Sequence, residues 1–260
     1  MEVVILETAQ QVAELAADAI EELLAAKPDA TLGLATGSSP LGVYRELGRR
    51  VAAGTVSLAR ARGFLLDEYV GLPAVHPQGY RAVIRRELEE LVDLAEDAVA
   101  GPDGGAPDLP AACADYEHRI AAAGGIDLQL LGVGTDGHVA FNEPGSSLAS
   151  RTRVKTLTDQ TRADNARFFG SPQDVPRHVI TQGRGTIREA RHLVLIATSA
   201  VKADVVRQLV EGPVTASCPA SVLQLHPHVT VVLDEDAAAQ LTLADYYRQA
   251  FAGKPEWQGL

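Results

Sequence analysis

The stretch Thr31-Leu-Gly-Leu-Ala35 is an apolar run of strand length, and Thr36-Gly-Ser-Ser-Pro40 follows it directly. A helical pattern begins at about residue 40 and continues to about residue 53. The apolar run does not alternate with polar residues, which is typical of a strand covered on both faces. A strand, a tight glycine-containing turn and a helix form the repeating unit of a parallel sheet, so this stretch predicts an α/β fold.

The same alternation extends to both ends of the chain. A further helix is expected between Val3–Leu6 and Thr31, where Thr8 and Gln11 have capping-box spacing. We therefore predict one α/β domain over residues 1–260, with a mostly parallel sheet and helices packed around it. The other predicted strands are Gly63–Leu66, Ile126–Val133, Arg177–Thr181, Leu193–Ala197 and Val229–Leu233, and the other predicted helices span about 78–92, 109–123, 200–211 and 236–251.

The composition and net charge of the chain indicate which kinds of molecule it can bind. The 260 residues include 46% hydrophobic and 22% charged residues, as in ordinary globular proteins, and the formal net charge is −11. This charge disfavours nucleic acid and anionic membranes as partners, although a locally positive pocket can still bind a small anion. The two cysteines, Cys113 and Cys218, are far apart, and neither a signal peptide nor a run of membrane-spanning length is recognisable. We expect a soluble, cytoplasmic protein.

Ligands of open parallel sheets bind outside the carboxyl ends of the strands, so the loops at those ends are the candidate site. In the first of these loops, Thr36, Gly37, Ser38 and Ser39 offer hydroxyl and backbone N–H groups at the start of a helix, which suit a phosphate. The alternative is a capped helix start without a ligand. A nucleotide P-loop is excluded because no Gly-Lys-Ser/Thr follows.

A second loop begins with Asp67, at the end of the strand Gly63–Leu66. A carboxylate in this position can serve as a general base. A helix cap or a surface acid is the alternative for a lone aspartate.

The third loop, Gly132 to Pro144, contains a literal G-x-G-x-x-G pattern after a strand. A dinucleotide site is disfavoured, because Pro144 interrupts the helix that should follow and no acidic residue closes a second strand. Asp136, His138 and Glu143 remain on this loop. Carboxylates beside a histidine fix its tautomer and raise its basicity, so the loop predicts proton transfer near neutral pH.

Two other features are less specific. His226 and His228 lack a third ligand at suitable spacing, so we interpret them as structural and predict no metal site. The segment from Ser146 to Arg167 carries five basic and two acidic residues together with several hydroxyls, which favours an anion site over a solvated face. Lys202 follows a strand end and is a further candidate phosphate ligand.

Together these segments resemble the glucosamine-6-phosphate deaminase family, over nearly the whole chain and in the same order. The Asp-Glu-Tyr-Val-Gly-Leu and Gly-His-Val-Ala-Phe-Asn-Glu-Pro motifs are specific, whereas the glycine-rich loop alone is not. Ser39 replaces a common threonine, and the tail Ala252–Leu260 looks divergent. The matching stretches are Ala35–Pro40, Asp67-Glu-Tyr-Val-Gly-Leu72, Leu131–Pro144, Ser146–Thr156, Asn165–Phe169 and Cys218–Pro227.

The resemblance implies a Rossmann-like sheet, a homo-oligomer that is often a hexamer, and catalysis without a cofactor. It implies that His138 opens the sugar ring, tuned by Asp136 and Glu143, and that Asp67 moves a proton from C2 to C1. The expected phosphate ligands are Thr36, Gly37, Ser38, Ser39, Arg167 and Lys202. An N-acetylglucosamine-6-phosphate effector site is implied at Ser146, Arg153 and Lys155, with Arg151 beside them.

Three alternatives remain open at this stage. A 6-phosphogluconolactonase has a similar Gly-x-Asp-Gly-His loop, but Thr-Ala-Ser usually follows the histidine, where this chain has Val139-Ala-Phe. A non-catalytic sugar-phosphate sensor is disfavoured, since no DNA-binding segment precedes Val3 and all four candidate catalytic residues are present. A nucleotide-binding dehydrogenase is the weakest alternative.

Overall fold

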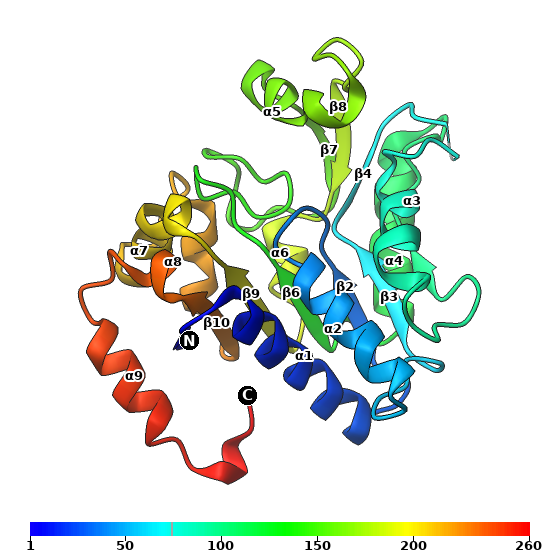
Figure 1. Ribbon diagram of the computed structural model, residues 1–260. Coiled ribbons are helices and arrows are strands. Elements are labelled where there is room, and N and C mark those ends of the chain that lie inside the picture. Colours follow the sequence, from blue (N-terminus) through cyan, green and yellow to red (C-terminus); the bar gives the residue numbers. More distant parts are fainter. Residues whose placement is uncertain (74) are drawn as a thin grey trace.

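The computed structural model describes residues 1–73 and 75–260, and its centre is a seven-stranded sheet in which every neighbouring pair is parallel (Figure 1). The predicted parallel α/β fold is therefore confirmed. Because all strands point the same way, their carboxyl ends meet at one edge. Across the sheet the strands are β1 (Glu2–Leu6), β10 (Val229–Asp234), β9 (His192–Ala197), β6 (Leu128–Leu131), β2 (Thr31–Leu34), β3 (Arg62–Leu65) and β5 (Val99–Ala100).

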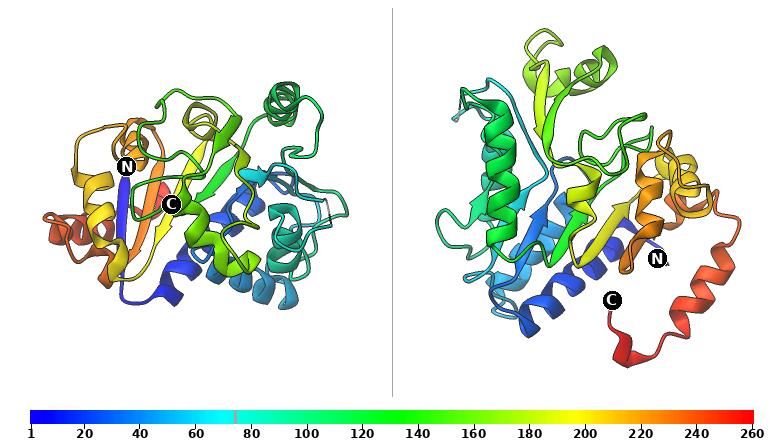
Figure 2. Two further views of the ribbon diagram at one scale, coloured as in Figure 1. Left: turned by 90° about the horizontal axis from the view of Figure 1, so that it is seen from above. Right: turned by 180° about the vertical axis from the view of Figure 1, so that it is seen from behind.

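Helices cover both faces of this sheet, as Figures 1 and 2 show. On one face pack α1 (Ala9–Ala26), α2 (Leu41–Ala52) and α3 (Tyr80–Ile84), which continues as a π-helical turn over Arg85–Glu89. The predicted capping box at the start of α1 is present, with Thr8 and Gln11 bonded to each other's backbone. The other face is covered by α4 (Leu109–Ala122), α6 (Arg184–Ile187), α7 (Ala203–Glu211), the 3₁₀ segment Pro219–Leu225 and α8 (Glu235–Ala238).

Two hydrophobic cores result from alternation within the central strands. In β9, Leu193 and Leu195 face the core under α4 and α7, whereas Val194 and Ile196 face the core under α1 and α2. Successive side chains of a strand point to opposite faces, so a strand buried on both sides must be apolar throughout. The two cores account for the uninterrupted apolar runs in the sequence.

A second sheet of three antiparallel strands extends from the end of β3, and it was not predicted. It consists of β4 (Asp67–Tyr69), β8 (His178–Thr181) and β7 (Arg153–Thr156). The predicted strand at Arg177–Thr181 is present as β8, but its assignment to the parallel sheet was wrong. Helix α5 (Asp159–Phe169) connects β7 to β8, and these three elements project from the rest of the molecule (Figures 1 and 2).

The predicted helix at 236–251 is interrupted, and α8 and α9 (Ala244–Ala252) are separate. The carboxylate of Glu211 accepts hydrogen bonds from the backbone N–H groups of Thr242 and Leu243, both at 2.9 Å. These amides cannot also continue the helical hydrogen-bond ladder, so the chain breaks there. A 3₁₀ turn over Glu256–Gln258 follows α9, and the 3₁₀ turn Ala200–Lys202 precedes α7.

Candidate functional site

The predicted loops do converge at the carboxyl edge of the parallel sheet. The loop after β2 contacts the loop after β6, because a Cβ on Gly132 would lie 3.2 Å from Oγ of Ser39. Lys202, after β9, donates a hydrogen bond from Nζ to the carbonyl oxygen of Val133 at 2.8 Å. Three sequence-distant segments therefore border one region.

The loop Thr36–Pro40 has the properties of an anion site. Gly37 adopts φ +95°, which favours glycine, and both Gly37 and Ser38 are exposed. Pro40 occupies the N-cap of the twelve-residue helix α2, where it provides no side-chain cap. The first N–H groups of α2 therefore remain free of a side-chain acceptor among the described residues, and they can bind an anion.

Asp136 and His138 form a hydrogen-bonded pair. Nδ1 of His138 lies 2.6 Å from Oδ1 of Asp136, which also accepts from the backbone N of His138 at 3.1 Å. Burial acts to raise the pKa of Asp136, but the hydrogen bonds from His138 outweigh it and hold that pKa below its usual range. An ionised Asp136 orients the imidazole and leaves Nε2 available for proton transfer.

Two positions of the loop around Asp136 and His138 require glycine, because a larger side chain would collide with neighbouring atoms. A Cβ on Gly134 would lie 2.1 Å from Cε1 of His138, and one on Gly137, at φ +83°, would lie 2.9 Å from Sγ of Cys218. Both positions therefore allow the backbone to pass close to the imidazole and to the buried thiol. The three glycines of the G-x-G-x-x-G pattern thus allow close packing against three different side chains, those of Ser39, His138 and Cys218.

Asp67 is the first residue of β4 and only 5% exposed. Burial, assisted by the negative charge of Glu68, raises its pKa well above the ordinary value. A carboxyl group with this environment is a stronger base than a solvated aspartate, which is the property that proton abstraction needs.

Lys202 is half-buried next to the Asp136 loop. Burial lowers the pKa of Lys202, while the charge of Asp136 opposes that effect. Its ammonium group lies beside the glycine-rich loop, in a position to bind an anion there.

The carboxylate of Glu143 faces helix α5. It accepts hydrogen bonds from the hydroxyl groups of Thr161 and, at 3.4 Å, Thr158. Among the described residues no hydrogen bond joins Glu143 to His138, so its tuning of the imidazole stays a prediction. Arg167 lies in the last turn of α5 with an exposed side chain over the ring of Phe168, and the structure does not bring it to the Thr36 loop.

The predicted effector residues lie in β7 and in the segment that precedes it. Oγ of Ser146 donates to the carbonyl oxygen of Glu143 at 2.7 Å. Arg151 is paired with two carboxylates, those of Glu117 and Glu189. Arg153 and Lys155 are partly exposed in β7, and burial lowers the pKa of Arg153.

Sequence reasoning missed Arg184, which is 1% exposed and borders this region. It donates to the carbonyl oxygens of Ser146 and Ser147, and its Nη1 has no partner among the described residues. Burial, together with the charge of Arg153, lowers the pKa of Arg184 to about 10. Its sequence context, Gly-Arg-Gly, carries no signal that distinguishes it from a surface arginine.

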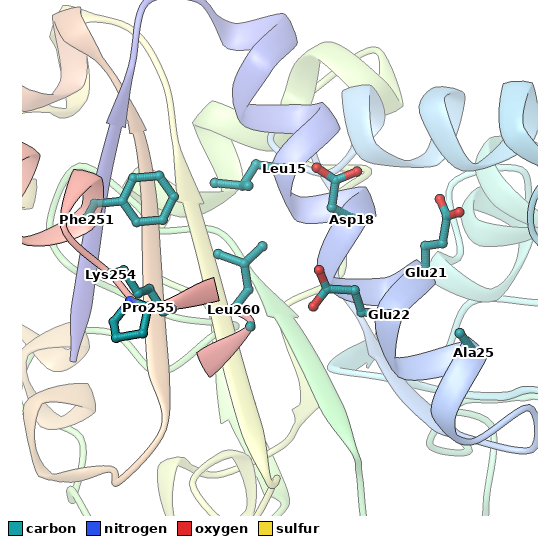
Figure 3. A pocket seen from close by; sticks show the side chains of 10 residues that line it. Leu15, Asp18, Glu21, Glu22, Ala25, Phe251, Lys254, Pro255 and Leu260 are labelled. Carbon is teal, nitrogen blue, oxygen red and sulfur yellow. The ribbon is translucent and has the colours of Figure 1, made fainter. Parts of the chain in front are cut away.

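The other candidates lie elsewhere. Both ring nitrogens of His226 have backbone partners, the carbonyl of Ala190 at 2.8 Å and the N–H of His228 at 3.1 Å, which fits the structural interpretation. A pocket of about 610 Å³ lies between α1 and the C-terminal segment and is bordered by Glu22 and Leu260 (Figure 3). It includes none of the candidate site residues.

None of the helices in the described residues has the length and the apolar character that a membrane span needs.

The fold and these groups define an α/β protein with a candidate anion-binding loop and a hydrogen-bonded carboxylate–imidazole pair at the carboxyl edge of its sheet. Residues 6–232 match the family model described as glucosamine-6-phosphate isomerases/6-phosphogluconolactonase. The chain belongs to this family.

Relatives and solved structures refine the assignment. The chain is 65% identical to a glucosamine-6-phosphate deaminase of Pseudarthrobacter chlorophenolicus and 64% identical to one of Mycolicibacterium smegmatis, over 100% of each chain. A monomeric glucosamine-6-phosphate deaminase is similar in structure with a TM-score of 0.89 and 40% identity, covering 92% of this chain and all of that one. A 6-phosphogluconolactonase from Trypanosoma cruzi has a TM-score of 0.74 at 23% identity, covering 93% and 97%, and this likeness concerns the fold alone. The resemblance to the deaminases is therefore confirmed.

Proposed function

We propose that this protein is an enzyme that converts glucosamine 6-phosphate and water to fructose 6-phosphate and ammonium. The observation that carries the proposal is the buried, high-pKa Asp67 at the same sheet edge as the His138–Asp136 pair. The full-length identity to proteins named glucosamine-6-phosphate deaminase supports the same reaction.

The proposed steps need only proton transfers and water. His138 moves a proton from the anomeric hydroxyl to the ring oxygen, and the ring opens. Asp67 then takes the C2 proton and returns it to C1 through an enolamine, which leaves an imine at C2. Water hydrolyses the imine and releases ammonia, which is protonated to ammonium. The reaction is redox-neutral overall, so the proposal includes no cofactor and no catalytic metal.

For the phosphate we propose Thr36, Gly37, Ser38, Ser39 and Lys202 as ligands, supported by the uncapped start of α2 and the half-buried ammonium. Arg167 would reach the same phosphate only by movement of α5 toward the sheet edge. Glu143 would follow that movement, because its carboxylate is bound to the first turn of α5.

A second proposal concerns regulation. Ser146, Arg151, Arg153 and Lys155 would form an effector site for N-acetylglucosamine 6-phosphate. The two carboxylates bound to Arg151 leave Arg153 and Lys155 as the principal cations for a phosphate. The neighbouring buried guanidinium of Arg184 supports a positive potential in this region.

We also propose a cytoplasmic homo-oligomer, as large as a hexamer, that takes part in N-acetylglucosamine catabolism. Both cysteines are buried free thiols, which fits a reducing compartment. Light scattering coupled to size-exclusion chromatography tests the assembly, and a monomer, as in the solved relative, would contradict it.

The test of the reaction compares two substrates. The purified protein is incubated with glucosamine 6-phosphate and, separately, with 6-phosphogluconolactone. We expect ammonium release from the first and no enzyme-dependent hydrolysis of the second. Lactone hydrolysis without ammonium release would replace the deaminase proposal with the lactonase alternative.

A further inference from the structure

Three buried polar side chains connect the segment of Asp67 to the loop of His138. Thr181, the last residue of β8, the adjacent Gln182, and Asn142 are all completely buried. Burial of a polar side chain costs free energy unless its groups form hydrogen bonds. The partners of these three residues therefore indicate what they do.

One set of bonds holds the chain that leads to Asp67. The backbone N of Gln182 donates to the carbonyl oxygen of Leu66 at 2.8 Å, and Nε2 of Gln182 donates to that of Leu65 at 2.8 Å. Thr181 lies opposite Asp67 in the antiparallel pairing of β4 with β8. Gln182 and Thr181 thus fix the backbone on which the buried carboxyl group sits.

A second set holds the chain that follows His138. Nδ2 of Asn142 donates to the carbonyl oxygen of Val139 at 3.0 Å and to that of Gln182 at 2.8 Å. The backbone N of Phe141 donates to Oγ1 of Thr181 at 3.1 Å. The side-chain amide of Asn142 therefore donates one hydrogen bond to the His138 loop and the other to the segment that holds Asp67.

We propose that Asn142 is a positioning residue that sets the place of His138 relative to Asp67. Its importance for turnover rests on the proposed function, in which the two groups act in turn on neighbouring carbons of one substrate. A displacement of about 1 Å between reacting groups costs up to roughly 100-fold in rate. Of the uncharged side chains of similar size, only an amide offers two N–H donors on one nitrogen.

The variant Asn142→Ala removes this connection. We expect kcat to fall about 10- to 100-fold with KM within about twofold, because Asn142 makes no hydrogen bond to the Thr36 loop. The matched control is Gln224→Ala, whose Nε2 also donates to two carbonyl oxygens, those of Leu209 and Gly212, both at 2.9 Å. Since these partners lie at the end of α7, the control should lower the melting temperature and leave kcat near that of the wild type.

Thr181→Val provides a second test that keeps the side-chain shape. It removes the acceptor for Phe141 and should lower kcat several-fold at unchanged KM, as expected for one neutral hydrogen bond of about 1 kcal/mol. This variant decides the question if Asn142→Ala does not fold.

A readout independent of turnover is the imidazole NMR signal of His138, assigned with His138→Gln. We expect this signal to shift in Asn142→Ala and in Thr181→Val, and to stay in place in Gln224→Ala. A wild type that releases no ammonium would refute the proposed function, while the imidazole signals would still test the positioning role. Unchanged imidazole signals in both variants, or equal losses of kcat in Asn142→Ala and Gln224→Ala, would overturn the proposal.

Discussion

Asp67 combines a chemical advantage with an energetic cost, and both follow from its burial at the start of β4. Desolvation favours the protonated carboxyl group and makes the carboxylate a stronger base. The same desolvation makes the ionised group unfavourable in the folded protein at neutral pH.

The catalytic consequence is tested by Asp67→Asn. The amide cannot accept the C2 proton, so we expect turnover to fall about 10²- to 10⁴-fold in a protein with a wild-type circular dichroism spectrum. In the wild type, kcat should decline on the acid side at a pH above the ordinary aspartate pKa of 3.8, since the base must be ionised. Near-normal turnover in the asparagine variant would exclude Asp67 as the base.

Burial of Asp67 also makes the stability of the folded protein depend on pH. The folded protein holds the Asp67 proton more tightly than the unfolded chain, so the stability from this group is full below pH 3.8 and is lost as the pH rises through the folded pKa. Asp67→Asn should therefore have a higher melting temperature than the wild type at pH 7, and the difference should shrink toward pH 4. A melting temperature below that of the wild type at pH 7 would contradict this account.

Among the proposed phosphate ligands, Lys202 has a position fixed by a hydrogen bond from its Nζ to the carbonyl oxygen of Val133. Lys202→Ala should raise KM about 10- to 100-fold with a smaller change in kcat, because a charge-assisted hydrogen bond contributes about 1.5–3 kcal/mol. Arg207→Ala is the matched control, since Arg207 is a partly exposed cation in α7 that is paired with Asp204, and it should leave KM unchanged. If Lys202→Ala keeps the wild-type KM, the phosphate lies elsewhere.

The sequence predicts some of these residues and not others, for a physical reason. Asp67, His138 and Lys202 each follow a strand of the parallel sheet, so the topology alone brings them to one edge. Asn142 and Arg184 acquire their partners through folding of the 139–150 region against the end of β8. Asn142 lies in a specific motif and Arg184 does not, but in neither case does the neighbouring sequence indicate these partners. Local patterns do not reveal such long-range hydrogen bonds.

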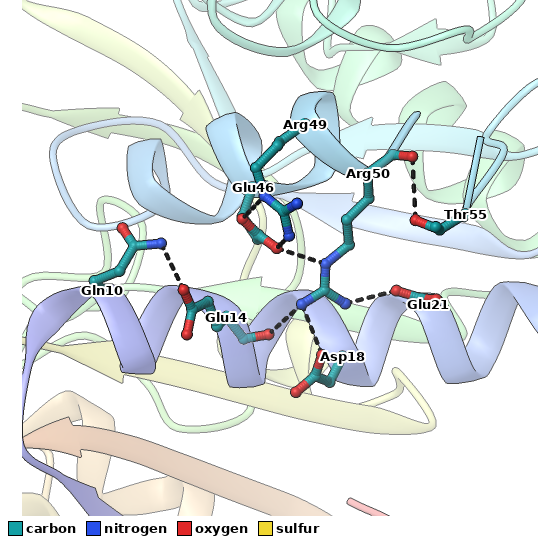
Figure 4. A network of polar contacts seen from close by, with 8 residues as sticks. All are labelled: Gln10, Glu14, Asp18, Glu21, Glu46, Arg49, Arg50 and Thr55. Atoms are coloured by element: carbon teal, nitrogen blue, oxygen red, sulfur yellow. Dashed lines mark hydrogen bonds and ion pairs between the residues drawn. The ribbon is translucent and has the colours of Figure 1, made fainter. Parts of the chain in front are cut away.

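At the scale of elements, a charge network joins α1 to α2. Arg50 of α2 contacts Glu46 in its own helix and reaches Asp18 and Glu21 of α1, at 2.6 to 2.7 Å (Figure 4). Glu46 is 4% exposed, so its ionised form depends on the two arginines that contact it, Arg49 and Arg50. The network fixes α1 against the helix whose first turn follows the Thr36 loop.

Glu46→Gln tests this connection. The hydrogen bond from Arg49, with that from Arg50, outweighs burial and lowers the pKa of Glu46 to about 2. Its stabilising effect is therefore present above pH 4.5 and is lost as the pH falls toward 2. At pH 7 the variant should lose on the order of 1.5–3 kcal/mol of unfolding free energy in urea denaturation. An unchanged midpoint at pH 7 would show that the network is not stabilising.

The two strands of the second sheet that the sequence did not predict are short and polar; helix α5 between β7 and β8 was not predicted either. β4 and β7 contain three and four residues with several charged side chains, and they are strands because β8 supplies the hydrogen-bond partners. Propensity for strand formation depends strongly on such tertiary context. The longer apolar strands of the central sheet needed no such context and were all predicted, whereas the two-residue strand β5 was not.

At the scale of the whole molecule, the proposed effector site would act on the reaction through β7 and α5. β7 carries Arg153 and Lys155, and α5 follows it and carries Arg167. An effector that binds one state of this region more tightly shifts the population toward that state, with a coupling of about 1–3 kcal/mol in typical cases.

The proposed regulation predicts sigmoidal saturation with glucosamine 6-phosphate that becomes hyperbolic when N-acetylglucosamine 6-phosphate is added. Arg153→Ala should keep the sigmoidal curve and be insensitive to the effector. A hyperbolic wild-type curve that does not respond to the effector would remove the regulatory proposal and leave the catalytic one intact.

The most direct test of the central claim is product analysis after incubation of the wild-type protein with glucosamine 6-phosphate in deuterated buffer. Ammonium and fructose 6-phosphate are quantified by NMR, and the C1 position of the sugar is examined for deuterium. We expect equal amounts of the two products and deuterium at C1, because the proton that Asp67 carries exchanges with solvent. Absence of ammonium, or ammonium with no fructose 6-phosphate beside it, would contradict the account.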